Sequence, residues 1–149
     1  MADYIQALKR GLEAAEVADR ARKEIDSVFD DLDRQLRGET EGKIGIKREE
    51  FEVERQSTLT YWSTTGSPEK ERYWAIVAYN PKIPNSPVKK LAIWSQERTG
   101  YPSKIAWAKL KVTCEDKKGL EDALEKLISD PLIGEVLQAL MQLNEKTPE

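Results

Sequence analysis

A helical pattern of unusual length opens the chain and limits what it can fold into. From residue 3 to residue 37, apolar residues recur at steps of three and four, the period of one helix face. At about 1.5 Å per residue such a helix is roughly 50 Å long, whereas a compact domain of 149 residues is only about 40 Å across. The helix must therefore either bend, with Gly11 as its weakest point, or project and pack against another molecule.

The ends of this helix carry recognisable signals. Asp3 followed by Gln6 resembles a capping box at its start, and Gly38 is a natural stop. Four acidic residues also precede a basic residue by four positions, which supports a helix. The pattern thus predicts one helix over residues 3–37.

The apolar stripe of this helix does not sustain a regular coiled coil. Asp19 and Arg22 fall where a strict heptad requires apolar residues. The apolar stripe nevertheless begins at the very start of the helix. We expect a short contact between two copies, in a homodimer, through Ile5, Leu8 and Leu12.

Strand signals occupy residues 43–113. Alternating or β-branched and aromatic runs occur near residues 44–46, 51–53, 59–62, 72–79, 88–96 and 104–113. Turn-forming residues separate several of these runs, and no helical pattern lies between them. Connections without helices join antiparallel strands, so we predict an antiparallel meander of four to five strands.

Two short helices are predicted at the end of the chain, over residues 117–144. Asp130 is placed to cap the second of them, with Pro131 at its first position. Residues 145–149 have the composition of a disordered tail. The whole chain, residues 1–149, is thus expected to form one α+β domain, in which a long helix precedes the sheet and two helices pack on it.

Charge is distributed unevenly along the chain. The net charge is −4 over residues 1–42, 0 over 43–80, +6 over 81–114 and −5 over 115–149, which sums to −3. A basic central segment therefore lies between acidic ends. It serves either an external partner or the acidic helices of the same fold.

The basic segment also carries aromatic residues. Cations beside aromatic rings on a sheet are typical of single-stranded nucleic-acid binding. If 104–113 is one strand, alternation places Trp107 with Lys109 and Lys111 on the face away from the helices. The alternative is that the tryptophans cap the core and the lysines are solvated edge charges. The candidate partner-binding residues are Lys89, Lys90, Trp94, Arg98, Tyr101, Lys104, Trp107, Lys109 and Lys111.

Aromatic residues also cluster in two other predicted strands, at Tyr61, Trp62, Tyr73, Trp74 and Tyr79. Adjacent residues of a strand point to opposite faces, so large rings must occupy both faces of the sheet. If helices cover only one face, the other presents an aromatic contact surface. If the first helix covers the second face, the domain is a three-layer sandwich without such a surface.

Catalysis and metal binding have little support. The chain has no histidine, and its one cysteine, Cys114, stands beside Glu115 and Asp116, which disfavour a thiolate. Phosphate-loop, dinucleotide and hydrolase motifs are missing from the sequence. The acidic cluster Asp26, Asp30, Asp31 and Asp33 lacks the loop pattern of a calcium site and has arginines beside it. We expect no enzyme, no metal and no cofactor.

These patterns favour an interaction protein. The first hypothesis is a cytoplasmic adaptor or inhibitor that binds a protein through an aromatic and lysine-rich sheet face and self-associates through its first helix. The alternative is a nucleic-acid-binding protein that uses the basic segment, residues 81–114. Neither a signal peptide nor an apolar run long enough to span a membrane is evident in the sequence, so no membrane partner is expected.

Overall fold

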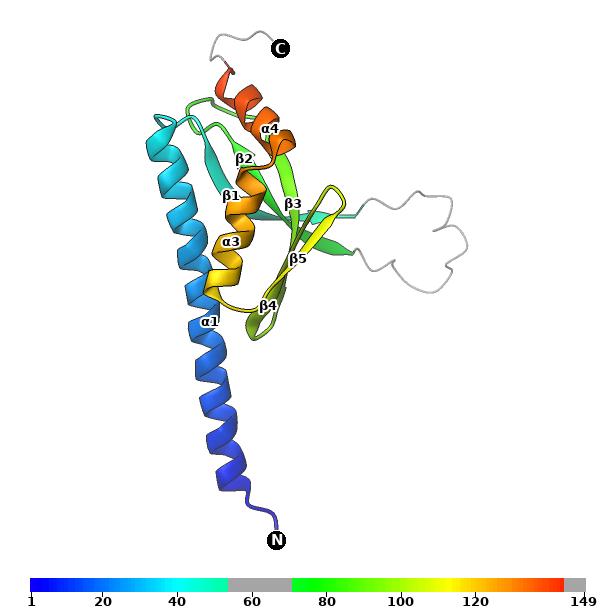
Figure 1. Cartoon of the computed structure of the whole chain (residues 1–149). Coiled ribbons are helices and arrows are strands. Elements are labelled where there is room, and N and C mark those ends of the chain that lie inside the picture. The colour runs from blue at the N-terminus through cyan, green and yellow to red at the C-terminus, as the bar shows by residue number, and fades with distance from the viewer. Residues whose placement is uncertain (54–70, 144–149) are drawn as a thin grey trace, which may run out of the picture.

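A computed structural model describes residues 1–53 and 71–143 of the chain. It contains three helices and one five-stranded sheet in this part of the chain (Figure 1). The elements are α1 (Tyr4–Glu39), β1 (Gly45–Glu52), β2 (Arg72–Tyr79), β3 (Lys89–Glu97), β4 (Gly100–Trp107), β5 (Leu110–Cys114), α3 (Lys117–Ile128) and α4 (Pro131–Met141). The strand signal at 59–62 and the tail 145–149 lie outside the described residues.

Helix α1 is continuous and its N-terminal part projects from the rest of the molecule. Figure 1 shows this part extending well past the end of the sheet, and every residue from Met1 to Val17 is exposed. The predicted cap is present, because the Asp3 carboxylate accepts a hydrogen bond from the Gln6 amide at 3.1 Å. Of the two expectations for this long helix, projection is correct.

The five strands lie in chain order, and every neighbouring pair is antiparallel. Helices α1, α3 and α4 cover one face of the sheet, as Figure 1 shows. The core lies between this covered face and the helices. The sheet contributes Ile76, Trp94 and Ile105 to it, and α3 contributes Leu120 and Leu127. The predicted α+β architecture is therefore confirmed, and the three-layer sandwich is wrong for the helices described.

One predicted strand is in fact two. The segment 104–113 was expected to be a single strand, but Ala108 and Lys109 form a tight turn between β4 and β5. Ala108 has a φ of 51°, a region that residues with a side chain rarely occupy. Across this turn Trp107 pairs with Leu110 and Ala106 pairs with Lys111. The turn therefore places Ile105 and Trp107 on the covered face, opposite to the predicted one. Leu110, Lys111 and Val112 of β5 keep their predicted faces.

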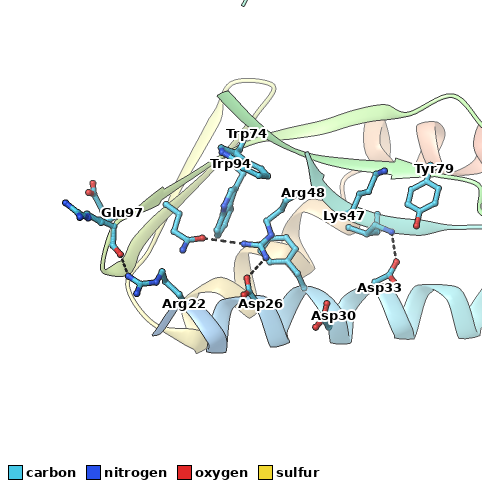
Figure 2. Close-up of a pocket in the computed structure, with 14 residues that line it drawn as sticks. Arg22, Asp26, Asp30, Asp33, Lys47, Arg48, Trp74, Tyr79, Trp94 and Glu97 are labelled. Atoms are coloured by element: carbon cyan, nitrogen blue, oxygen red, sulfur yellow. Dashed lines mark hydrogen bonds and ion pairs between the residues drawn. The ribbon is translucent and has the colours of Figure 1, made fainter. Parts of the chain in front are cut away.

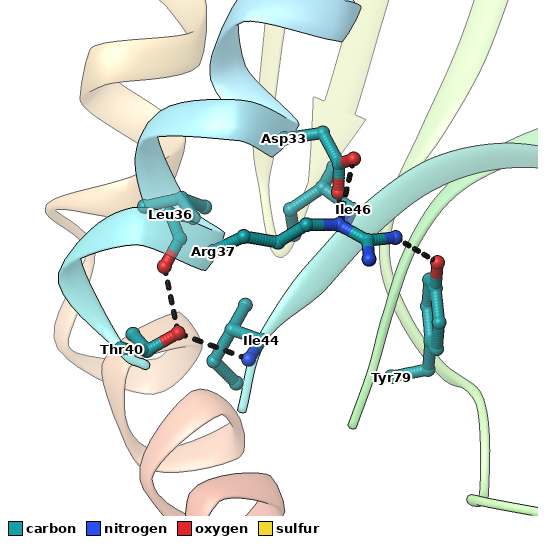
Figure 3. A network of polar contacts seen from close by, with 7 residues as sticks. All are labelled: Asp33, Leu36, Arg37, Thr40, Ile44, Ile46 and Tyr79. Atoms are coloured by element: carbon teal, nitrogen blue, oxygen red, sulfur yellow. Dashed lines mark hydrogen bonds and ion pairs between the residues drawn. The ribbon is translucent and has the colours of Figure 1, made fainter. Parts of the chain in front are cut away.

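The C-terminal end of α1 is bonded to the edge strand β1 (Figure 3). The Asp33 carboxylate accepts hydrogen bonds from the Ile46 amide at 2.7 Å and from Arg37 at 2.9 Å. The Arg37 guanidinium also donates to the Tyr79 hydroxyl at 2.5 Å. In addition, the Ile44 amide donates to Thr40 Oγ1 at 3.1 Å. These bonds occupy amides at the sheet edge that another strand could otherwise pair with.

The middle of α1 is held at the opposite end of the sheet, by the turn between β3 and β4. Gly100, at φ +94°, lies so close to the helix that a Cβ there would be 2.8 Å from Cβ of Ala21. Arg22 donates to the carbonyl of Arg98 at 2.6 Å. Only a glycine permits both this backbone conformation and this approach. The body of the molecule therefore begins near residue 18, and the preceding helix is unsupported.

Candidate interaction surfaces

The projecting part of α1 carries an apolar stripe, which we call the N-terminal stripe: Ile5, Leu8 and Leu12. Their exposed fractions are 68%, 60% and 61%. Each residue of an α-helix is rotated by about 100° about the helix axis relative to the one before it. On average the side chains of the stripe therefore point more than about 90° away from those of the buried residues Ala18 and Ile25. The stripe is thus not a continuation of the face that packs on the sheet. It is an apolar surface on a different side of the helix.

The sheet face turned away from the helices is the second surface, which we call the outer face. Alternation and strand pairing place four lysines and two acidic residues on it within the described strands: Lys47, Lys90, Lys104, Lys111, Glu49 and Glu97. Between them lie small or apolar side chains, of which Ile93 is 44% exposed. This face carries a net positive charge.

Two aromatic rings border the outer face where β1 and β2 meet. Phe51 stacks on Tyr73, with ring centroids 5.8 Å apart. The Lys90 ammonium lies 4.1 Å from the Phe51 centroid and donates to the Tyr73 hydroxyl at 2.6 Å. Lys90 thus joins the two rings by a cation–π contact and a hydrogen bond.

The predicted partner-binding residues do not form one site. Lys90, Lys104 and Lys111 share the outer face. Lys89 is exposed at the start of β3, and Arg98 and Lys109 lie in the turns at either end of β4. The half-buried Tyr101 donates its hydroxyl to Glu24 of α1 at 2.8 Å.

The two tryptophans of the predicted set belong to the core. Trp94 is 4% exposed and packs edge-on against Phe29 of α1, with ring centroids 5.0 Å apart. Trp107 is 5% exposed and donates its indole N–H to Asp130 at 2.9 Å. The expectation that Trp107 is exposed with Lys109 and Lys111 is therefore wrong. The turn at Ala108, which the sequence did not indicate, is the physical reason.

Sequence reasoning also missed part of the outer face. Phe51 and Ile93 were not among the candidate residues, although Phe51 and Tyr73 stood in aromatic strand signals. Tyr61 and Trp62, the other rings of the predicted aromatic surface, lie outside the described residues. The strand pairing of Phe51 with Tyr73 is what brings two rings together.

A cleft of about 900 Å³ separates α1 from β1, β2 and β3 (Figure 2). Arg48 lies within it, with its guanidinium 4.3 Å from the Phe29 ring centroid and 2.6 Å from an Asp26 carboxylate oxygen. Asp33, at one end, is bonded to Ile46 and Arg37. The cations and carboxylates that line this cleft thus largely neutralise each other. The contacts across it join α1 to the sheet.

Cys114 and the acidic cluster of α1 are the residues that the sequence analysis considered for catalysis and metal binding. Burial raises the pKa of the Cys114 thiol, an effect that the nearby Asp116 reinforces and the neighbouring Ser103 hydroxyl opposes. In the acidic cluster, Asp31 pairs with Arg34, and Asp26 with Arg48. Within residues 1–53 and 71–143, no group of three acidic or cysteine side chains could hold a metal ion.

None of the helices in the described part of the chain has the length and apolar character needed to cross a membrane. Comparisons of the chain with protein-family models, curated proteins and solved structures find no match.

Proposed function

We propose that this protein is a non-enzymatic adaptor or inhibitor that acts by contact with other macromolecules. In this proposal it self-associates through the N-terminal stripe and presents the outer face of its sheet to a partner. A cytoplasmic location is part of the proposal, because a single buried free thiol suits a reducing compartment.

The projection of α1 is the observation that carries this proposal. Residues 4–17 extend about 20 Å at helical rise without contributing to the core. An isolated helix of that length is marginal in water, and its stripe exposes three large apolar side chains. A second copy that covers the stripe would stabilise the helix and remove the apolar surface from water.

The expected strength of this contact follows from the side chains involved. Only three large apolar side chains per copy would be covered, and their burial must offset the translational and rotational freedom lost on association. We therefore expect a weak dimer whose population rises with protein concentration.

Light scattering coupled to gel filtration tests the proposal, at concentrations from about 1 to 200 μM. We expect the mean mass to rise toward that of a dimer, and Leu12→Asp to hold the chain at monomer mass. Val17→Asp is the matched control, because Val17 is 58% exposed on the same helix but lies on the opposite side from the stripe. A monomer at every concentration, or equal effects of both substitutions, would refute self-association through the stripe.

A further inference from the structure

We infer that the partner of the outer face is a single-stranded nucleic acid, bound by lysines and by aromatic and apolar side chains of the open sheet. This inference rests on the proposed function in one respect, that the outer face is a contact surface. It does not depend on self-association through α1. Charge, side-chain type and shape each support it.

The first support is local charge. Lys90, Lys104 and Lys111 occupy the outer face, and Lys47 pairs there with Glu49 at 3.2 Å. Helices α1, α3 and α4, which come from the acidic segments of the sequence, lie on the other side of the sheet (Figure 1). At physiological salt the field of a charge decays over about 8 Å. The outer face is therefore locally positive although the protein is acidic overall.

The second support is the type of cation. All four cations of the outer face in the described strands are lysines, which act as point charges and bind phosphates without strict geometry. Three arginines are engaged elsewhere with acidic side chains: Arg37 with Asp33, Arg48 with Asp26 and Arg72 with Glu50. The outer face therefore offers lysines, and no arginine of these three pairs, for contacts with phosphates.

The third support is the side-chain content of the face. The small side chains of Ala106 and Ser95 lie between the lysines. The Phe51 and Tyr73 rings and exposed Ile93 offer apolar contacts for unstacked bases. A duplex groove admits a helix or a two-stranded ribbon, which a five-stranded sheet face does not match. The geometry thus favours a single strand over a duplex.

Fluorescence anisotropy of labelled probes tests the inference directly with the full chain. The probes are a 20-nucleotide oligo-dT, the matching oligo-U, a mixed-sequence duplex and a polyglutamate peptide of equal charge. We expect the single strands to bind. With four phosphate contacts, the affinity should fall about 50-fold between 50 and 200 mM salt, since single strands follow a slope of about −0.7 per contact.

Paired substitutions locate the site. Lys104→Gln with Lys111→Gln removes two outer-face cations and should roughly halve the salt slope. Lys117→Gln with Lys126→Gln makes the same change in net charge on exposed positions of α3 and should leave binding unchanged. Phe51→Leu keeps an apolar side chain but removes the ring, and should weaken binding about 10-fold without changing the slope.

Three outcomes would overturn the inference. They are no binding of single strands at 50 mM salt, tighter binding of the duplex or polyglutamate than of single strands, and equal loss of binding in the two lysine pairs. Circular dichroism confirms that each variant is folded. Because Leu12→Asp changes the stripe alone, we expect this monomeric variant to bind oligonucleotide as the native chain does, so that failure of self-association and failure of this inference are distinguishable.

Discussion

At the scale of single residues, Arg48 is the side chain that joins α1 to the sheet. It is 19% exposed and lies 4.3 Å from the Phe29 ring centroid and 5.6 Å from that of Trp94. Its ion-pair partner Asp26 is 62% exposed. An ion pair so exposed to solvent contributes less than about 1 kcal/mol to the free energy of unfolding. Contact with the rings should therefore matter more than the charge pair.

Two substitutions separate these contributions. We expect Arg48→Ala to lower the free energy of unfolding by about 2 kcal/mol, because it removes both the cation and the stem that cover the rings. Asp26→Asn should lower it by less than about 1 kcal/mol. Urea denaturation followed by circular dichroism measures both. Equal losses in the two variants would mean that the ion pair, not ring contact, joins the layers.

At the scale of elements, α4 depends on one aspartate with two roles. Asp130 Oδ1 accepts from the Leu132 amide at 2.8 Å and caps the helix, while Oδ2 accepts the indole N–H of Trp107 at 2.9 Å. Loss of a cap costs about 1 kcal/mol, and a buried donor left without a partner costs about 1–3 kcal/mol. One carboxylate thus ties the start of α4 to the end of β4.

We therefore expect Asp130→Ala to lower the unfolding free energy by about 2–3 kcal/mol, whereas Asp130→Ser, which retains a capping oxygen, should recover about 1 kcal/mol of that loss. Thermal and urea unfolding of the two variants provide the measurement. If serine restored the stability of the native chain, the indole hydrogen bond would contribute nothing.

The elements also show how far the sequence alone could predict this structure. Helices were predictable because their signals are local: the Asp3 cap and the Asp130 cap are both present where expected. The β4–β5 turn was not, because Trp107, Ala108, Lys109 and Leu110 contain no glycine, asparagine or proline to mark it. This one unmarked turn reversed the predicted face of Trp107. The pairing of Phe51 with Tyr73 depends on register, which no local signal gives.

At the scale of the whole molecule, the chain divides into a packed body and an unsupported helix. The first buried residue of α1 is Ala18. The buried side chains of all three described helices pack together on one face of the sheet. Acidic helices and a lysine-bearing outer face lie on opposite sides of this body. The stripe and the outer face are therefore separate surfaces, so the two proposed contacts do not exclude each other.

This division predicts the effect of removing residues 1–14. The shortened chain should unfold in urea within about 1 kcal/mol of the full chain at low concentration, because the deleted residues are exposed throughout. Only the full chain should gain stability as its concentration rises, since association stabilises the folded state by mass action. Denaturation midpoints at about 1 and 100 μM measure both effects. A large loss of stability at low concentration would show that the projecting helix packs on the body, because no second copy is then bound to account for it.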